Sequence, residues 1–321
     1  MVIQDNTVVF LFPGQGAQYR GMALDFLEHS GEAKRRFALA SEIMGKDMRT
    51  LIGESDDETL KRTDVSQPAI TLADLAAAAY LVERGLRPVG CAGFSLGEYA
   101  ALATAGVISL EDCFRLVKAR GAAMQAAADR IKAESGAAAP GMAAVIGLAP
   151  EQVEALIAEW KTTGLVDLYA ANINSPRQTV VAGTAAALGE AETRFKAAGA
   201  RRVLRLPVAG PFHSPLIADA AAQFGPTLES IQFKDPLIPV YSNVTGRQVS
   251  SGAEAKQLAF RQITEPLRWV EEEQAVAGQE GIQGALETGP GKVLQGLWKD
   301  SGSGLPCFTA GTVGEIDALL S

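Results

Sequence analysis

The sequence predicts an α/β protein with a mostly parallel sheet and a smaller subdomain inserted into it. Between residues 7 and 130, short apolar runs alternate with helical patterns, the order that produces a parallel sheet covered by helices. From residue 142 to residue 206 the order changes to βαββαβ, and after Pro207 the first pattern returns. We therefore expect a large α/β subdomain made of residues 1–135 and 207–321, and an inserted small subdomain made of residues 136–206.

The elements of the first segment follow from apolar patterning and from proline and glycine. Thr7 to Phe12 is a Val- and Phe-rich strand that ends in the glycine-containing loop 13–18. A helix is expected from Ala69 to Arg84, with Pro68 in its first turn, where the missing N–H costs nothing. The next elements are a strand at 88–93, a helix at 96–105 and a helix from Leu110 to about Arg130.

The second half of the chain begins with a stretch at 132–141, whose Gly, Ala and Pro residues are typical of a linker. The ferredoxin-like order follows, with strands at 142–148, 166–173, 178–183 and 201–206 and helices at 150–161 and 184–198. Beyond it we expect a helix from about 215, an apolar strand from Leu237 to Tyr241, a helix near 253–263 and another apolar stretch at 282–287.

Composition excludes several function classes. The 321-residue chain has a formal net charge of −8 and no cluster of Lys and Arg, which argues against a nucleic-acid binder. Its cysteines, Cys91, Cys113 and Cys307, are odd in number and lack metal-ligand spacing, so we expect a reducing, cytoplasmic location and no metal. No basic n-region opens the chain, and no run approaches the roughly 20 apolar residues of a membrane span. Without a long heptad pattern, we expect a monomer.

The pentad Gly93-Phe94-Ser95-Leu96-Gly97 has the form G-x-S-x-G between a predicted strand and a predicted helix. Small residues there allow the sharp turn that exposes a serine hydroxyl in front of a helix N-terminus, so Ser95 is a candidate nucleophile. The alternative is that Ser95 only caps the helix. The order strand, pentad, helix favours the nucleophile.

Histidine is scarce, because the chain contains only two. His213 precedes Ser214 and Pro215, a plausible N-cap and first-turn residue, so its ring would lie beside a helix N-terminus that disfavours imidazolium. A neutral histidine can take the proton of a serine, and a serine nucleophile needs such a base. The alternative is a histidine packed in a loop. Arg120, on an amphipathic helix, is of interest only if it faces Ser95, since arginine there is more often solvated.

Several motifs in this order resemble malonyl-CoA:acyl carrier protein transacylases and the related acyltransferase domains of polyketide synthases. The resemblance covers nearly the whole chain and implies a hydrolase-like large subdomain with an inserted ferredoxin-like small one. The motifs are Phe12-Pro13-Gly14-Gln15-Gly16-Ala17-Gln18, Ser66-Gln67-Pro68-Ala69, the pentad with Glu98-Tyr99, Arg120, Phe212-His213-Ser214 and Glu287-Thr288-Gly289-Pro290-Gly291-Lys292.

The resemblance also implies roles for individual residues. Ser95 would carry the malonyl group as an ester, and His213 would act as base and then as acid. The backbone N–H groups of Gln15 and Leu96 would form the oxyanion hole, in keeping with a glycine-flanked loop and a helix N-terminus. Arg120 would grip the free carboxylate of malonate with its planar fork.

Further positions follow from the same resemblance. Gln262 would orient the histidine through its backbone carbonyl, so its side chain should matter little. Asn172 and Asn243 are expected near the pocket. Phe94 stands where many relatives have histidine, which affects the pocket wall and not the catalytic pair. Phe212 resembles polyketide domains that select malonyl over methylmalonyl groups, since a ring there fills the space of an α-methyl.

These observations lead to the hypothesis of a ping-pong malonyltransferase of fatty-acid synthesis. Malonyl-CoA, a coenzyme A thioester, would acylate Ser95, and the phosphopantetheine thiol of acyl carrier protein would accept the group, with no tightly bound cofactor. The alternatives are a trans-acting polyketide synthase acyltransferase, a serine thioesterase or esterase, and a binding module without activity. A candidate docking surface for the acidic carrier protein is formed by basic residues of the small subdomain, for which the alternative is an ordinary solvated face: Arg194, Lys196, Arg201, Arg202 and Arg205.

Overall fold

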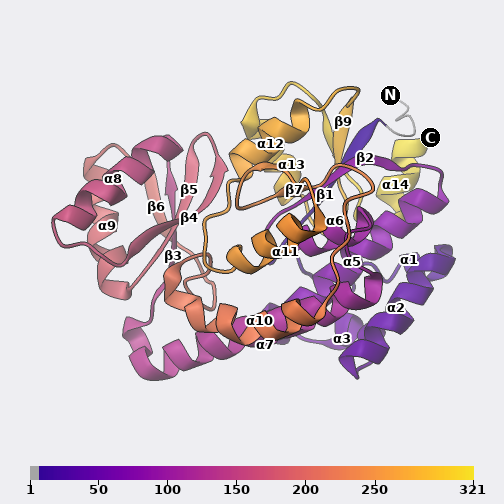
Figure 1. Ribbon diagram of the computed structural model, residues 1–321, viewed down its shortest axis with the longest axis horizontal. Coiled ribbons are helices and arrows are strands. Elements are labelled where there is room, and N and C mark those ends of the chain that lie inside the picture. Colours follow the sequence, from indigo (N-terminus) through magenta and orange to yellow (C-terminus); the bar gives the residue numbers. More distant parts are fainter. Residues whose placement is uncertain (1–6) are drawn as a thin grey trace.

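The computed structural model describes residues 7–321 and contains two principal sheets, which confirms the predicted α/β class. Figure 1 shows the antiparallel sheet at the left of the molecule and the parallel sheet in its right half. The parallel sheet has the order β10-β9-β1-β2, and the antiparallel sheet has the ferredoxin-like order β4-β5-β3-β6. The strands of the parallel sheet are β1 (Val8–Phe12), β2 (Pro88–Gly93), β9 (Gly284–Glu287) and β10 (Cys307–Thr309), and those of the antiparallel sheet are β3 (Gly141–Ile146), β4 (Leu168–Ser175), β5 (Gln178–Gly183) and β6 (Arg202–Arg205).

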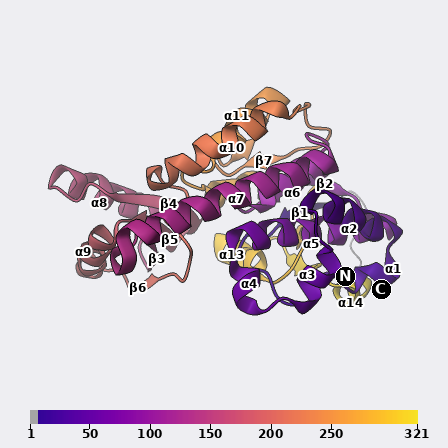
Figure 2. The ribbon, with the colours of Figure 1, turned by 90° about the horizontal axis from the view of Figure 1, so that it is seen from below.

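Helices cover both sheets. The long helix α7 runs from the large subdomain toward β3 and leads the chain into the antiparallel sheet (Figures 1 and 2). Helices before the small subdomain are α1 (Phe26–His29), α2 (Gly31–Met44), α3 (Met48–Glu54), α4 (Asp57–Lys61), α5 (Thr63–Glu83), α6 (Gly97–Thr104) and α7 (Leu110–Ser135). Later helices are α8 (Pro150–Thr162), α9 (Ala185–Ala197), α10 (Ala218–Ser230), α11 (Gly252–Arg261), α12 (Trp269–Ala277), α13 (Val293–Ser301) and α14 (Val313–Leu320), with 3₁₀ turns η1 (Gly136–Ala138) and η2 (Pro215–Ile217).

One face of the antiparallel sheet has a core of its own, whereas its other face joins the core of the large subdomain through Met142, Ala144 and Val180. Strands β1 and β2 are buried on both faces, as expected of a parallel sheet between helices. In the small subdomain, α8 and α9 pack on one face of the antiparallel sheet, where Trp160 and Phe195 meet edge to face at 4.7 Å between ring centroids. The boundaries placed at residues 136 and 206 stay a prediction.

Helix α5 differs from its prediction. It begins at Thr63, not at Ala69, so Pro68 lies inside the helix. The start is fixed by a long-range bond that no local pattern reveals, in which the Thr63 N–H donates to Gln125 Oε1 at 2.7 Å. Contrary to expectation, α5 is also long and apolar enough to cross a membrane by length and composition, but 94% of its apolar window is buried inside the protein, as in a core helix.

The strand expected at 237–241 is also different. Only Tyr241–Ser242 form a strand, β7, which pairs antiparallel with β8 (Arg247–Gln248). Val240 makes a single parallel bridge to Cys91 at the edge of the large sheet. The predicted linker at 132–141 is instead partly helical, because α7 continues to Ser135 and the 3₁₀ turn η1 follows.

Candidate active site

Ser95 lies in a sharp turn between β2 and α6. Its φ of 52° is in the left-handed region, which side chains rarely adopt outside strained functional turns. Two glycines make the turn possible: a Cβ on Gly93 would lie 2.1 Å from the Gly97 carbonyl carbon, and one on Gly97 would lie 2.0 Å from the Phe12 oxygen. The G-x-S-x-G pattern therefore has a steric cause, and it produces the predicted nucleophile-elbow geometry.

The loop after β1 packs against this turn. A Cβ on Gly14 would lie 2.4 Å from the carbonyl oxygen of Phe94, so only glycine allows the approach. The approach brings Gln15 to the cavity that contains Ser95. Within residues 7–321, the backbone N–H groups of Gln15 and Leu96 donate to no protein acceptor, which leaves both available to a ligand.

His213 faces Ser95 across the turn. Its Nε2 lies 2.9 Å from Ser95 Oγ, and its Nδ1 lies 2.7 Å from the backbone oxygen of Gln262. A carbonyl oxygen only accepts, so Nδ1 carries the hydrogen and Nε2 directs a lone pair at the serine hydroxyl. This tautomer suits the removal of a proton from Ser95.

The environment of His213 differs from the prediction in one respect. The element after it is the three-residue turn η2, and Ser214 does not cap it but donates its hydroxyl to the Pro211 oxygen at 2.6 Å. Burial and, as a smaller cause, the nearby Arg120 cation together lower the pKa of His213 to about 3, against the opposing hydrogen bond to Gln262. The ring is thus neutral as expected, but because of burial and charge and not because of a long helix.

Arg120 faces Ser95 from the middle of α7. One of its terminal nitrogens donates to Ser95 Oγ at 3.2 Å and to Gln262 Oε1 at 3.0 Å, and its guanidinium carbon lies 5.4 Å from the centre of the Tyr99 ring. Only 1% of Arg120 is exposed, and no carboxylate of residues 7–321 forms an ion pair with it. The site therefore holds a desolvated cation that no carboxylate contacts directly, and the nearby buried Glu98 is its one acidic electrostatic partner among the described residues.

The side chain of Gln262 matters more than expected. Its backbone oxygen holds His213, as predicted, but its fully buried amide also donates to the Ser95 oxygen at 3.0 Å and to Glu98 Oε2 at 2.6 Å. Its Oε1 accepts from Arg120. One residue thus contacts the base, the cation and the backbone of the nucleophile.

Asn243 lies directly behind the nucleophile, next to the cavity but outside its lining. Its Oδ1 accepts from the Ser95 N–H at 2.6 Å, and its Nδ2 donates to Glu272 Oε2 at 2.6 Å and to the Gly93 oxygen at 2.7 Å. Burial raises the pKa of Glu98 to about 7 and holds that of Glu272 well above its ordinary value. These groups hold the strained turn from inside the protein.

A cavity of about 250 Å³ opens in front of Ser95. Its walls come from both subdomains, with His213 and Arg120 on the large-subdomain side and Asn172 and Asn174 of β4 on the other. Phe94 and Phe212 supply aromatic walls, and Phe94 packs edge to face on Trp269 at 5.4 Å between centroids. The selective effect expected of Phe212 stays a prediction.

Comparison with known proteins assigns a family to this arrangement. Residues 9–300 match the model of the acyl transferase domain. The chain belongs to the acyl transferase family. This acyl transferase is 38% identical over 295 residues to malonyl CoA-acyl carrier protein transacylase of Bacillus subtilis (strain 168), a match that covers 92% of the chain and 90% of the relative. The resemblance drawn from the sequence motifs is confirmed.

Solved structures agree with this family. An acyl carrier protein S-malonyltransferase of Vibrio cholerae O1 superposes with a TM-score of 0.90 at 36% identity, covering 98% of this chain and all of the other. A malonyl-transacylase in complex with its type II polyketide synthase acyl-carrier protein superposes with a TM-score of 0.88 at 34% identity, covering 98% and 99% of the two chains.

Sequence reasoning assigned no role in the site to Asn174, Glu98, Glu272 or Trp269, although Glu98 belongs to one of the family motifs. Asn174 lies two residues after Asn172 on β4, so the alternation of a strand could have identified it as a second amide on the same face. Glu98 on α6 is marked only by the motif that follows the pentad, and no local signal marks Glu272 and Trp269 on α12. Among residues 7–321 of the acyl transferase, no group of three or more His, Cys, Asp or Glu side chains could hold a metal ion.

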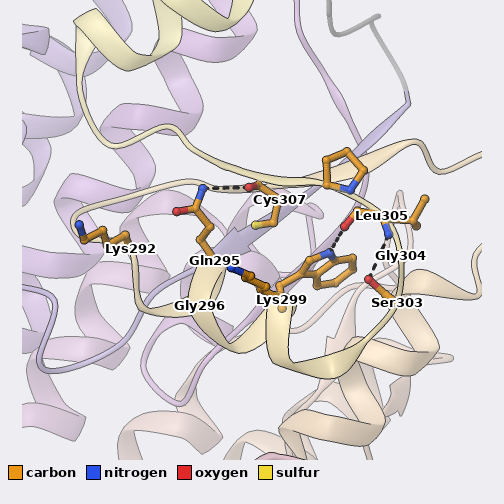
Figure 3. A pocket seen from close by; sticks show the side chains of 10 residues that line it. Lys292, Gln295, Gly296, Lys299, Ser303, Gly304, Leu305 and Cys307 are labelled. Carbon is orange, nitrogen blue, oxygen red and sulfur yellow. Dashed lines mark hydrogen bonds between the residues drawn. The ribbon is translucent and has the colours of Figure 1, made fainter.

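A second hollow, of about 800 Å³, lies between α13 and the segment before β10 (Figure 3). It contains neither Ser95 nor His213. Two of its polar groups are already bonded within the protein, since Gln295 Nε2 donates to the Cys307 oxygen at 2.9 Å and Trp298 Nε1 to the Leu305 oxygen at 2.8 Å. Ser95, His213 and Arg120 all line the smaller cavity instead.

Proposed function

We propose that this acyl transferase moves the malonyl group from malonyl-CoA to the phosphopantetheine thiol of acyl carrier protein. The observation that carries the proposal is the unpaired, buried Arg120 cation 3.2 Å from a serine that is hydrogen-bonded to a neutral histidine. A serine and histidine alone suit any acyl group. A buried cation beside them favours an acyl group that ends in a carboxylate.

In the first half-reaction, His213 Nε2 takes the Ser95 proton while Oγ attacks the thioester carbonyl. The tetrahedral intermediate collapses with cleavage of the carbon–sulfur bond, and the departing CoA sulfur receives the proton from His213. In the second half-reaction, the carrier's thiol gives its proton to His213 and attacks the malonyl ester, and Ser95 Oγ recovers the proton. The neutral ring and its fixed tautomer support both directions of transfer.

The oxyanion of each tetrahedral intermediate would accept from the free N–H groups of Gln15 and Leu96. Both belong to segments whose glycines fix the backbone tightly, so the donors are preorganised before substrate binds. Leu96 also lies at the N-terminus of α6, where developing negative charge is stabilised.

The pantetheine arm would enter past β4. The side-chain oxygens of Asn172 and Asn174 are buried and have no hydrogen-bond partner among the described residues, although both residues line the cavity. Such groups are costly unless a ligand satisfies them. The amides of a pantetheine arm would supply the missing donors. CoA and phosphopantetheine thus act as substrates, and the chemistry as proposed needs no bound cofactor or metal.

A cytoplasmic location and a monomeric state belong to the same proposal. Cys91 and Cys113 are free and buried, in keeping with a reducing compartment. The solved malonyl-transacylase complex supports an acyl-carrier protein as partner. We assign the enzyme to fatty-acid synthesis. The alternative, a trans-acting acyltransferase of a polyketide synthase, would use the same chemistry.

The test is the intact mass of the protein after mixing with malonyl-CoA. We expect an increase by one malonyl group, which disappears when holo-acyl carrier protein is added and appears on that protein. A thioesterase or esterase would instead release malonate at the same rate with and without carrier protein. An unchanged mass with no turnover would indicate a binding module and overturn the proposal.

We also expect the carrier protein to dock at the basic edge of the small subdomain. Arg194 and Lys196 are engaged by Glu190 and Glu192 on α9, whereas Arg201, Arg202 and Arg205 form no ion pair with other described residues. Exchanging Arg201 and Arg202 for glutamate should raise KM for the carrier several-fold and leave KM for malonyl-CoA unchanged. The matched control Arg49→Glu, on α3, should change neither, and equal effects on both substrates would contradict the docking site.

A further inference from the structure

We propose that Glu98 is a positioning residue whose carboxyl sets the orientation of the Gln262 amide and, through it, the place of the Arg120 guanidinium. Glu98 lies in the first turn of α6 and is 2% exposed, so it touches neither the cavity nor solvent. The inference rests on the proposed function, because it concerns how the same site holds a dicarboxylic acyl group.

The surroundings of the Gln262 amide allow only one orientation. Three oxygens lie around its nitrogen: Glu98 Oε2 at 2.6 Å, the Ser95 carbonyl at 3.0 Å and Asn243 Oδ1 at 3.4 Å. A pure donor, the Arg120 guanidinium, lies 3.0 Å from its oxygen. The reversed amide would place nitrogen against the guanidinium and oxygen against three acceptors.

Glu98 makes the shortest of these contacts. The same oxygen that accepts from Gln262 also accepts from the Asn243 N–H at 3.1 Å, so the carboxyl is tied to the segment that holds the Ser95 backbone. An acceptor at this point forces the amide nitrogen toward it. The amide oxygen is then left to face Arg120.

Arg120 depends on that oxygen. With no carboxylate of residues 7–321 in contact with it, its guanidinium is located by Gln262 Oε1, by Ser95 Oγ and by the Tyr99 ring. Without a fixed Gln262 oxygen, the Arg120 guanidinium would lose one of its two hydrogen bonds. It would then no longer be held in the orientation that faces the acyl group. The loss should therefore weaken malonyl transfer more than transfer of an acyl group without a carboxylate.

The experiment compares kcat/KM for malonyl-CoA and for acetyl-CoA in three proteins. Glu98→Leu has a similar volume and no acceptor, and we expect its malonyl-to-acetyl ratio to fall about tenfold or more, the effect of losing a hydrogen bond to a charged group. Glu98→Gln can still present an oxygen to Gln262 and should restore the ratio to within about threefold of wild type. A general loss of structure would lower both activities together and leave the ratio unchanged.

A second set of variants tests whether Glu98 acts on Arg120 through the Gln262 side chain. Gln262→Leu should lower the ratio by itself, and adding Glu98→Leu should lower it no further, because residues that act through one contact are not additive. If Glu98→Leu does not fold, Glu98→Asp serves instead, since its carboxyl is one methylene too short, and the same fall is expected. An unchanged ratio in these variants, or additive losses, overturns the role of Glu98. Absence of a malonyl adduct on the wild-type protein would instead overturn the proposed function.

Discussion

Replacing Ser95 by alanine should abolish the malonyl adduct and lower malonyl transfer by at least about 10⁴-fold. The hydroxyl is the one group that could form the ester, and the neighbouring His213 and Arg120 contact it at 2.9 Å and 3.2 Å. The backbone should not change, since alanine and serine have a similar cost at a φ of 52°. Intact mass after exposure to malonyl-CoA, together with the melting temperature, measures both effects.

The matched control for this change is Ser230→Ala. Ser230 is exposed, and its hydroxyl donates only to the Thr227 oxygen, in the last turn of α10. That variant should form the adduct as fast as wild type. An adduct that persists on Ser95→Ala would assign the nucleophile to another residue and contradict the mechanism.

The elbow could be predicted from the sequence because its cause is local. Gly93 and Gly97 stand where a Cβ would meet backbone at about 2 Å, so a short motif encodes the whole turn. The general base, His213, could not be identified from a local motif of this kind. His213 lies 118 residues away in the chain, and only the scarcity of histidine and the family resemblance connected it with Ser95.

The support behind the nucleophile could not be predicted in the same way. Glu98 has the pattern of an ordinary acidic residue in the first turn of a helix, where it would normally be solvated and favoured by the dipole. Asn243 follows a strand and resembles a turn former. Their functions depend on contacts 145 to 164 residues apart, namely those of Glu98 with Asn243 and with Gln262. These residues form a specific hydrogen-bond network because they are buried together. The burial of a single polar residue leaves no periodic pattern in the sequence, so it could not be predicted.

Replacing Arg120 by methionine should change both the stability of the protein and its selectivity for malonyl-CoA. Desolvating a cation that no carboxylate contacts costs several kcal/mol, and here two hydrogen bonds, the Tyr99 ring and the nearby buried Glu98 offset only part of this cost. Methionine fills the space without a charge, so we expect the free energy of unfolding of the free protein to rise by about 1–3 kcal/mol. Chemical denaturation without ligand measures this change.

The same variant should lose its preference for malonyl-CoA. The guanidinium would form charge-assisted hydrogen bonds to the malonyl carboxylate, each of about 1.5–3 kcal/mol, so the malonyl-to-acetyl ratio of kcat/KM should fall about 100-fold or more. Free malonate should raise the melting temperature of wild type and not that of Arg120→Met, since only a ligand bound to the folded state stabilises it. The matched control is Arg115→Met on the same helix, where the exposed arginine pairs with Glu111 and Asp112.

Arg115→Met should change stability by less than about 0.5 kcal/mol and leave the ratio intact, because surface ion pairs contribute little. If Arg120→Met instead lost stability and lowered malonyl and acetyl transfer alike, Arg120 would be a structural residue of α7. If Arg120→Met instead raised the free energy of unfolding and lost the preference for malonyl-CoA, the buried charge of Arg120 would be a binding feature. The protein would then retain this charge at a cost in stability because it binds an anionic acyl group beside Ser95.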